Sequence, residues 1–320
     1  MAATKGNIYF TAYDGTISRL DTINLSITGK IEVGDHPEAL TVANNKLYIN
    51  ISGYGSGNQI AVVDIATFKK TKNIEVLLNP YDVCTTGEDG KVYFISCGDF
   101  SGNPAQTLQC IDPQTDQVTE ICPASKMAMK DNKIYLIYAE YYENADPKSI
   151  SVYDMNTKQI SQPKESLRDI SINTIKPLND KELLIATDGA GVFKMNMDSY
   201  HTTPYVVADY NKNNAMNGNS INDIYVDDED RIWLANYPIG VTVRNNRYSS
   251  YNWIKHSIGN KQSLVNDQVN SIIEDSDGDL WFATNNGISL YYSKTGQWHS
   301  FLSSFDPDPQ NKNHIFITLC

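Results

Sequence analysis

The sequence predicts an all-β chain that folds as one seven-bladed β-propeller with four-stranded antiparallel blades. Two observations predict this fold. Helical periodicity is nearly absent from the 320 residues, and a short apolar triplet recurs after a turn along the whole chain. Short β-rich runs separated by Gly, Asn, Asp and Pro are typical of strands joined by tight turns. A repeat of about 40 to 50 residues is typical of propeller blades.

The triplet occurs seven times, and we assign it to the second strand of each blade. Its copies are Ile8–Phe10, Leu47–Ile49, Val92–Phe94, Ile134–Leu136, Leu183–Ile185, Ile232–Leu234 and Leu280–Phe282. Successive copies begin 39 to 49 residues apart, and a further step of 48 residues from Leu280 returns to Ile8 when the chain is counted as a circle. Seven units in circular register predict seven blades.

The other strands of a blade follow from the sequence around the triplet. A β-rich run precedes it, the third strand ends in an apolar residue followed by Asp, and a fourth run comes next. Examples are Glu38–Val42, Ser220–Val226 and Val269–Ile273 for the first strand, Leu20–Asp21 and Val63–Asp64 for the third, and Thr28–Val33 for the fourth.

The two chain ends are expected to complete one blade between them. The chain begins close to a second strand, so the first blade is predicted to lack its own innermost strand. The last apolar run, His314–Cys320, is predicted to pair beside Ile8–Phe10 and so to close the ring. Such pairing would remove two exposed strand edges.

Composition excludes several classes of partner. The net charge of −12 opposes binding to nucleic acid and to anionic membranes. No apolar run reaches the roughly 18 residues of a membrane helix, and Met1–Lys5 has no apolar core of a signal peptide. The chain as given is therefore expected to be a monomer that is cytoplasmic on expression, without membrane insertion.

The five cysteines predict neither a disulfide framework nor a metal site. They are Cys84, Cys97, Cys110, Cys122 and Cys320. No C-x-x-C pair is present, no His has zinc-ligand spacing to them, and the count is odd. We expect buried free thiols, although a bridge between neighbouring strands stays geometrically open.

The sequence of the repeat and the amino-acid composition both change near residue 162. Four of the five cysteines lie before this point and all four tryptophans after it. In the first half, residues 1–162, the runs Gly15–Asp21, Ile31–Glu38 and Ile60–Asp64 resemble the YVTN-type (YncE-like) surface propellers of bacteria. In the second half, residues 163–320, the runs Asn219–Val241 and Val269–Ile288 resemble the periplasmic propellers of hybrid two-component regulators in Bacteroides-like bacteria.

These resemblances imply a periplasmic or cell-surface origin and, for the second half, a domain that senses polysaccharide fragments. Two explanations of the change near residue 162 stay open. The chain is either an engineered or recombined chimera of two half-propellers, which we favour, or one natural propeller whose blades have diverged. A blade array of one origin should not change its repeat at a single point.

Acidic runs lie between the predicted first and second strands. The run Asp275–Asp279 looks like the start of a calcium loop, but it lacks the later bidentate Glu. Similar runs, Asp227–Asp230 and Glu88–Gly90, occupy the same place in other blades. Because hairpin turns favour Asp and Gly, we interpret all three runs as turns and expect no metal.

No catalytic constellation or cofactor motif is recognisable. The five histidines are scattered, and His36 is assigned a structural role in a loop between blades. Loops between second and third strands instead gather aromatic and amide side chains, which suit an oligosaccharide or a peptide. The candidate ligand-binding residues are Tyr13, Tyr54, Phe100, Tyr141, Tyr142, Tyr237 and Asn285.

Three functions remain in view. The preferred one is a non-enzymatic propeller that binds a carbohydrate. A scaffold that binds no ligand is the second. The third is an enzyme, such as a polysaccharide lyase or glycosidase, which would need His, Tyr or acidic side chains to converge on the loop face.

Overall fold

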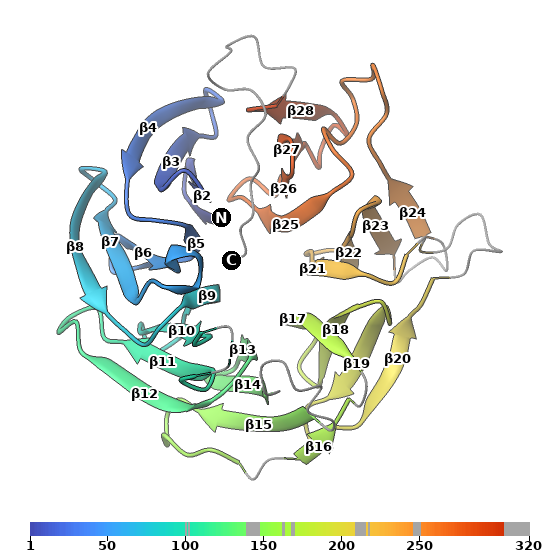
Figure 1. The fold of residues 1–320 in the computed structure, drawn as a ribbon. Coiled ribbons are helices and arrows are strands. Elements are labelled where there is room, and N and C mark those ends of the chain that lie inside the picture. Colours follow the sequence, from blue (N-terminus) through green and yellow to red (C-terminus); the bar gives the residue numbers. More distant parts are fainter. Residues whose placement is uncertain are drawn as a thin grey trace. The chain divides into compact units, whose positions relative to one another are not determined.

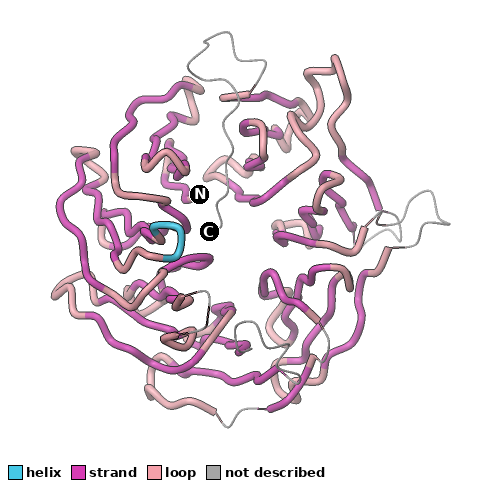
Figure 2. Tube along the Cα trace, in the orientation of Figure 1, coloured by secondary structure: helices cyan, strands magenta, loops and turns pink. Residues whose placement is uncertain are grey.

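The computed structural model describes residues 1–99, 101, 103–138, 148–161, 164–167, 170–208, 216, 218–245 and 251–303. Two compact units divide the chain, the first spanning Met1–Asp169 and the second beginning at Ile170. Four four-stranded antiparallel sheets lie in the first unit and three in the second, which confirms the seven-bladed β-propeller (Figure 1). In the described part of the chain, helix is limited to one 3-10 turn, η1 (Gly53–Gly55), drawn in cyan in Figure 2.

Each blade of the first unit uses four strands in chain order. The blades are β1 (Ala2–Thr4), β2 (Asn7–Ala12), β3 (Thr16–Asp21) and β4 (Ser26–Glu32); β5 (Pro37–Ala43), β6 (Lys46–Ile51), β7 (Gln59–Asp64) and β8 (Lys69–Glu75); β9 (Pro80–Thr86), β10 (Val92–Ser96), β11 (Thr107–Ile111) and β12 (Val118–Pro123); and β13 (Lys126–Lys130), β14 (Lys133–Tyr138), β15 (Lys148–Asp154) and β16 (Lys164–Ser166).

The second unit repeats this order in three blades. They are β17 (Ser171–Pro177), β18 (Glu182–Asp188), β19 (Val192–Asn196) and β20 (Thr202–Val206); β21 (Ile221–Val226), β22 (Arg231–Asn236), β23 (Gly240–Asn245) and β24 (Tyr251–Ile254); and β25 (Val269–Glu274), β26 (Leu280–Thr284), β27 (Gly287–Tyr291) and β28 (Trp298–Phe301).

All seven apolar triplets lie in second strands, as predicted. Their residues are apolar without alternation because both faces of a second strand are covered. Ile8, Tyr9 and Phe10, for example, are each at most 1% exposed. Strands covered on both faces contain continuous apolar runs rather than the two-residue period of a half-exposed sheet.

Apolar side chains fill the space between consecutive blades within each unit. Tyr9 and Ile17 of the first blade join one buried cluster with Leu40 and Ile49 of the second. In the second unit, Trp233 packs against Phe282 of the next blade, with ring centroids 6.0 Å apart.

Polar side chains also link neighbouring blades. Thr11 Oγ1 at the end of β2 donates to the Glu38 carbonyl of β5 across 2.9 Å, and Asn50 Nδ2 of β6 donates to the Tyr81 carbonyl of β9 across 2.8 Å. In the second unit, the buried Asp223 carboxylate lies 3.5 Å from Lys176 Nζ and accepts from the Ile272 amide. Because these groups are buried, loss of one partner would leave the other unsatisfied.

The first blade differs from the sequence prediction. Its innermost strand is formed by the N-terminal residues themselves, since β1 pairs with β2 through Ala2 opposite Tyr9, Ala3 opposite Ile8 and Thr4 opposite Asn7. The expectation that this blade lacks its own first strand is therefore wrong. The predicted closing strand, His314–Cys320, lies outside the described residues, and the place predicted for it beside Ile8–Phe10 is wrong because β2 pairs with β1 on one side and β3 on the other. Nor do the described residues include a helix long and apolar enough to span a membrane.

Candidate ligand-binding site

Exposed tyrosine rings gather around one buried carboxyl group in the first unit. We call this group the tyrosine–glutamate cluster, and it consists of Tyr13, His36, Glu38, Tyr54 and Tyr81. Tyr13 follows β2, His36 precedes β5, and Glu38 is the second residue of β5. Tyr54 lies in η1, and Tyr81 is the second residue of β9. Three consecutive blades of the first unit therefore contribute to the cluster.

The rings form a connected aromatic surface. The His36 ring lies 5.4 Å from the Tyr13 ring and 5.3 Å from the Tyr54 ring, measured between centroids. Tyr13 and Tyr81 share a side-chain hydrogen bond. Tyr13 is 36%, Tyr81 40% and Tyr54 74% exposed. Adjacent exposed rings offer apolar faces and hydroxyl groups together, which is the usual composition of a recognition surface.

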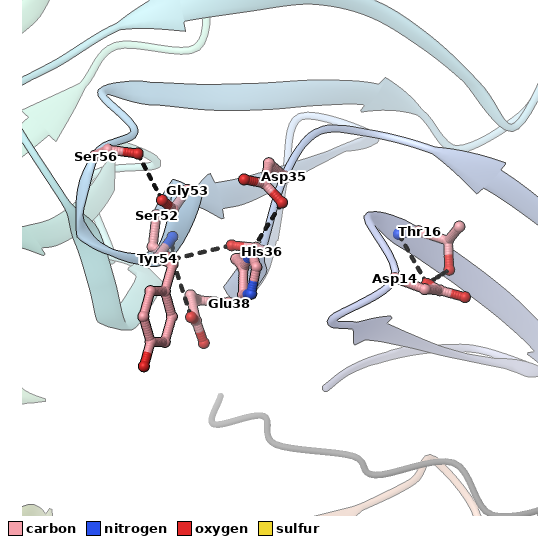
Figure 3. Close-up of polar contacts among 9 residues, drawn as sticks. All are labelled: Asp14, Thr16, Asp35, His36, Glu38, Ser52, Gly53, Tyr54 and Ser56. Carbon is pink, nitrogen blue, oxygen red and sulfur yellow. Dashed lines mark hydrogen bonds and ion pairs between the residues drawn. The ribbon is translucent and has the colours of Figure 1, made fainter.

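Glu38 is buried within this surface and is only 6% exposed. Its Oε1 lies 3.0 Å from Ser52 Oγ, which is also 3.1 Å from the His36 carbonyl oxygen (Figure 3). The single Ser52 proton thus serves two acceptors when Glu38 is ionised. Burial is the main cause that raises the pKa of Glu38 to about 7, and the Ser52 hydrogen bond opposes it.

The backbone of His36 and of Tyr54 lies in the left-handed region of φ. His36 has a φ of 46° and Tyr54 a φ of 54°. A non-glycine residue in this region costs on the order of 1 kcal/mol or more, and such residues often mark functional sites. The sequence therefore holds two of the ring-bearing residues in conformations that they do not favour on their own.

Short loops hold these residues in place. The Ser52 hydroxyl accepts from the Tyr54 amide at 3.3 Å, and the Gly57 amide donates to the Ser52 carbonyl at 2.7 Å. A Cβ atom at Gly57 would lie 2.3 Å from the Ile51 carbonyl oxygen, so only glycine fits there. These hydrogen bonds hold the Ser52–Gly57 loop, which includes Tyr54, in one tight turn.

Ionisation within the cluster is unfavourable at neutral pH for the Tyr13 phenol. Burial first, and then the Glu38 carboxylate, raise the pKa of Tyr13 to about 12. His36 Nδ1 lies 2.7 Å from Asp35 Oδ1, and the Asp35 side chain is largely exposed. The cluster thus presents the protonated phenol of Tyr13 and an imidazole paired with a carboxylate.

The structure brings together two of the predicted site residues, Tyr13 and Tyr54. Tyr237, which follows β22 and is 43% exposed, belongs to the second unit. So does Asn285, whose amide is used internally: its Oδ1 accepts from Asn270 Nδ2 at 2.7 Å and its Nδ2 donates to Gln268 Oε1 at 2.9 Å. The other predicted site residues, Phe100, Tyr141 and Tyr142, lie outside the described residues.

Sequence reasoning missed Glu38, His36 and Tyr81 as members of this group. His36 was assigned a structural loop role, yet its ring lies between those of Tyr13 and Tyr54. One signal was present in the sequence. A charged residue, Glu38, follows Pro37 at the start of a strand whose next residues, Ala39 and Leu40, are apolar. A carboxylate in that position is expected to be desolvated.

The acidic runs considered as calcium loops are hairpin turns. Asp275 Oδ1 accepts from the amides of Asp277 and Asp279, and Oδ2 accepts from Trp281 Nε1 at 2.7 Å. Asp227 binds Trp233 Nε1 in the same way at 2.8 Å.

The third run contains a related bond in the first unit. Asp89 Oδ2 accepts from the Tyr93 hydroxyl at 2.9 Å. The three turn carboxylates therefore have internal donors. Among the described residues, no three His, Cys, Asp or Glu side chains are placed to hold a metal ion.

The four cysteines in the described part of the chain are thiols. Cys84, Cys97 and Cys110 are buried, and Cys122 is half-buried. Burial raises the pKa of Cys97 to about 12 and that of Cys122 to about 11. Since the thiolate is the reactive form, these side chains are poor nucleophiles.

Comparisons with known proteins agree with the fold. A family model described as two component regulator propeller matches residues 263–286, which cover the end of the loop before β25 through the turn after β26. This match supports the resemblance of the second half to regulator propellers. No curated protein matches the chain.

Solved structures match over most of the chain at low identity. Two structures of the extracellular domain of one system from B. thetaiotaomicron, titled once as a one component and once as a hybrid two component system, have TM-scores of 0.53 and 0.54 and are 14% and 15% identical. They cover 92% and 94% of this chain, which spans 46% of each of theirs.

A third match is hydrazine synthase of Kuenenia stuttgartiensis, with a TM-score of 0.52 and 12% identity. The match extends over 90% of this chain and over 74% of the hydrazine synthase chain. An enzyme and an extracellular domain thus share this architecture, so the likeness at these identities is one of fold: the chain is a β-propeller similar to both.

Proposed function

We propose that this chain is a ligand-binding sensor propeller that recognises a small polar ligand, of the carbohydrate class, and catalyses no reaction. The observation that carries the proposal is the tyrosine–glutamate cluster, where exposed rings surround a buried carboxyl group. Rings can cover the apolar faces of sugar rings, while hydroxyl and carboxylate groups bond sugar hydroxyls. The regulator-propeller match and the extracellular relatives support a sensing role outside the cytoplasm.

A panel of oligosaccharides tests this function by thermal shift. The wild-type protein is expected to be stabilised by at least one glycan, since a ligand that binds only the folded state raises its stability. The Tyr54→Ala variant should lose this shift, because Tyr54 is 74% exposed and supplies a ring face.

The matched control is Ile23→Ala, which removes an 80% exposed apolar side chain of the first unit. This variant should keep the thermal shift of the wild type. If no member of the panel shifts the wild-type protein, the chain is better described as a scaffold that binds no glycan.

An enzyme is the second candidate, and one observation favours it. Glu38, with a pKa raised to about 7, lies near Tyr13 and His36, and a carboxyl group titrating near neutral pH is suited to proton transfer. A lyase or glycosidase of this kind would release shortened saccharides from the polymers in the panel. Detection of such products with wild-type protein, and their absence with Glu38→Gln, would replace the binding proposal with this one.

We also propose that the chain acts as a monomer and that its two halves, residues 1–162 and 163–320, have different origins. The change in the repeat sequence near residue 162 supports a chimera of a YVTN-like half and a regulator-like half. A blade-by-blade alignment with relatives tests this origin. A gradual drift of the repeat across all seven blades would contradict it.

A further inference from the structure

The buried carboxyl group of Glu38 has no positive charge beside it. No lysine or arginine in the described part of the chain forms an ion pair with it, and its one side-chain partner is the Ser52 hydroxyl at 3.0 Å. Its other oxygen, Oε2, makes no hydrogen bond to a described residue. Glu38 is only 6% exposed, and an ionised carboxylate in such a place is costly without a counter-charge. The cost is relieved either by protonation or by a bound group that supplies the positive charge.

The titratable groups of the cluster, together with the neighbouring Asp35 carboxylate and the Cys97 thiol, come from five segments, and none of them is a permanent cation. Tyr13 follows β2, His36 and its partner Asp35 precede β5, and Tyr54 lies in η1. Tyr81 lies on β9, and Cys97, whose pKa the Glu38 charge raises, follows β10. Phenol rings attract a cation through their faces, most strongly where water is partly excluded.

We propose that the tyrosine–glutamate cluster binds the ammonium group of a cationic ligand, with Glu38 as its counter-ion and the Tyr13, Tyr54 and Tyr81 rings as its walls. This inference rests on the proposed binding function and specifies the ligand class that this site selects. An amino sugar would satisfy both statements. The site should discriminate against neutral ligands of the same shape, because only a charged group compensates the desolvated carboxylate.

The charge of the site should depend on pH. Glu38 must be ionised to act as the counter-ion, and its pKa of about 7 in the unliganded protein means that protonation competes with the cation below neutral pH. Affinity is expected to rise by about tenfold for each pH unit from about pH 5.5 to pH 7 and then to level off.

Choline and its neutral isostere 3,3-dimethylbutan-1-ol provide a direct test with the whole chain. They have the same shape, and the quaternary ammonium group does not titrate, so a change of binding with pH reports on the protein and not on the ligand. Binding is followed by nuclear magnetic resonance titration at pH 8 and pH 6. Choline is expected to bind at least about tenfold more tightly than the alcohol at pH 8.

Two variants complete the experiment. Glu38→Gln keeps the shape and a Ser52 hydrogen bond, and should abolish both the preference for choline and most of its pH dependence. Glu75→Gln removes the same charge from the exposed end of β8 and should bind choline like the wild type. A circular-dichroism melting curve confirms that each variant is folded.

The outcomes separate this inference from the proposed function. Equal binding of choline and the alcohol, or an unchanged preference in Glu38→Gln, would overturn the cation inference. If neutral oligosaccharides shift the wild-type protein while choline does not bind, the inference fails and the binding function stands. If neither choline nor any glycan binds, both fail.

Discussion

A carboxyl group that is buried without a cation makes stability depend on pH. Glu38 has an ordinary pKa of 4.5 and a folded-state pKa of about 7. Between these values the unfolded chain has lost the proton while the folded protein keeps it. The contribution of Glu38 to stability is therefore fully present at low pH and falls as the pH rises from about 4.5 to about 7.

We expect this loss to disappear in Glu38→Gln. From pH 4.5 to pH 7.5, the unfolding free energy of the wild type should fall by up to about 3 kcal/mol relative to that of the variant. Urea unfolding followed by far-ultraviolet circular dichroism measures this difference. Parallel pH profiles of the two proteins would show that the Glu38 carboxyl group is solvated like an ordinary one.

Tyr54 is a residue whose conformation and exposure both oppose a purely structural role. Its φ of 54° is better tolerated by asparagine than by an aromatic residue. Tyr54→Asn should therefore leave stability unchanged or raise it by about 0.5 kcal/mol, while ligand binding is lost. Chemical denaturation and the glycan thermal shift measure the two effects. A loss of stability above about 1 kcal/mol would assign the Tyr54 ring to packing instead.

In the last blade, the hairpin between the first and second strands, β25 and β26, depends on the carboxylate of Asp275. Asp275→Asn would place an amide donor against either the Trp281 indole or two backbone amides. Two donors facing one another cost about 1 to 3 kcal/mol when they are buried. Since all four tryptophans lie in the second half of the chain, tryptophan fluorescence during urea unfolding reports on this unit.

The neighbouring substitution Asp277→Asn is the control for this turn. Asp277 is exposed, and its side chain accepts no hydrogen bond from the Trp281 indole, which binds Asp275. Its replacement should change stability by less than about 0.5 kcal/mol. Equal effects of Asp275→Asn and Asp277→Asn would mean that the indole hydrogen bond contributes little.

The strand elements were well predicted where covering on both faces leaves a continuous apolar run. The triplets Leu47–Ile49 and Leu280–Phe282 identified their second strands because both runs follow a turn, recur at the blade spacing and are buried on both faces. The strand Ala2–Thr4 was missed because it is short and has small side chains. Its pairing is determined by the backbone of β2, and such pairing leaves no pattern in three residues.

At the scale of the whole molecule, the candidate site is built from the first unit. Tyr13 and Tyr54 could be predicted because aromatic residues in loops between second and third strands stand out in the sequence. Glu38 and Tyr81 could not, since their place in the cluster depends on how β5 and β9 pack side by side. Desolvation of a carboxyl group is a property of that packing and not of its neighbours in the chain.

Tyr237 tests whether the second unit takes part in binding. If the tyrosine–glutamate cluster suffices, Tyr237→Ala should bind choline or the selected glycan with wild-type affinity, because Tyr237 belongs to the other unit. The same titration used for the Glu38 variants measures this. A drop in affinity of about tenfold or more would contradict the assignment of the binding site to the first unit alone.

The turn carboxylates have a consequence for tracing the ancestry of these blades. Asp89 accepts from a phenol four residues later, whereas Asp227 and Asp275 accept from an indole six residues later. A phenol or an indole, at a different sequence separation from the carboxylate, thus supplies the side-chain donor that the turn carboxylate accepts. The three hairpins have the same length, since Thr86 pairs with Val92, Val226 with Ile232 and Glu274 with Leu280. Related sequences should therefore exchange tyrosine for tryptophan only when the carboxylate also moves by two positions within the turn, and this paired change would serve as a marker of shared descent where overall similarity has faded.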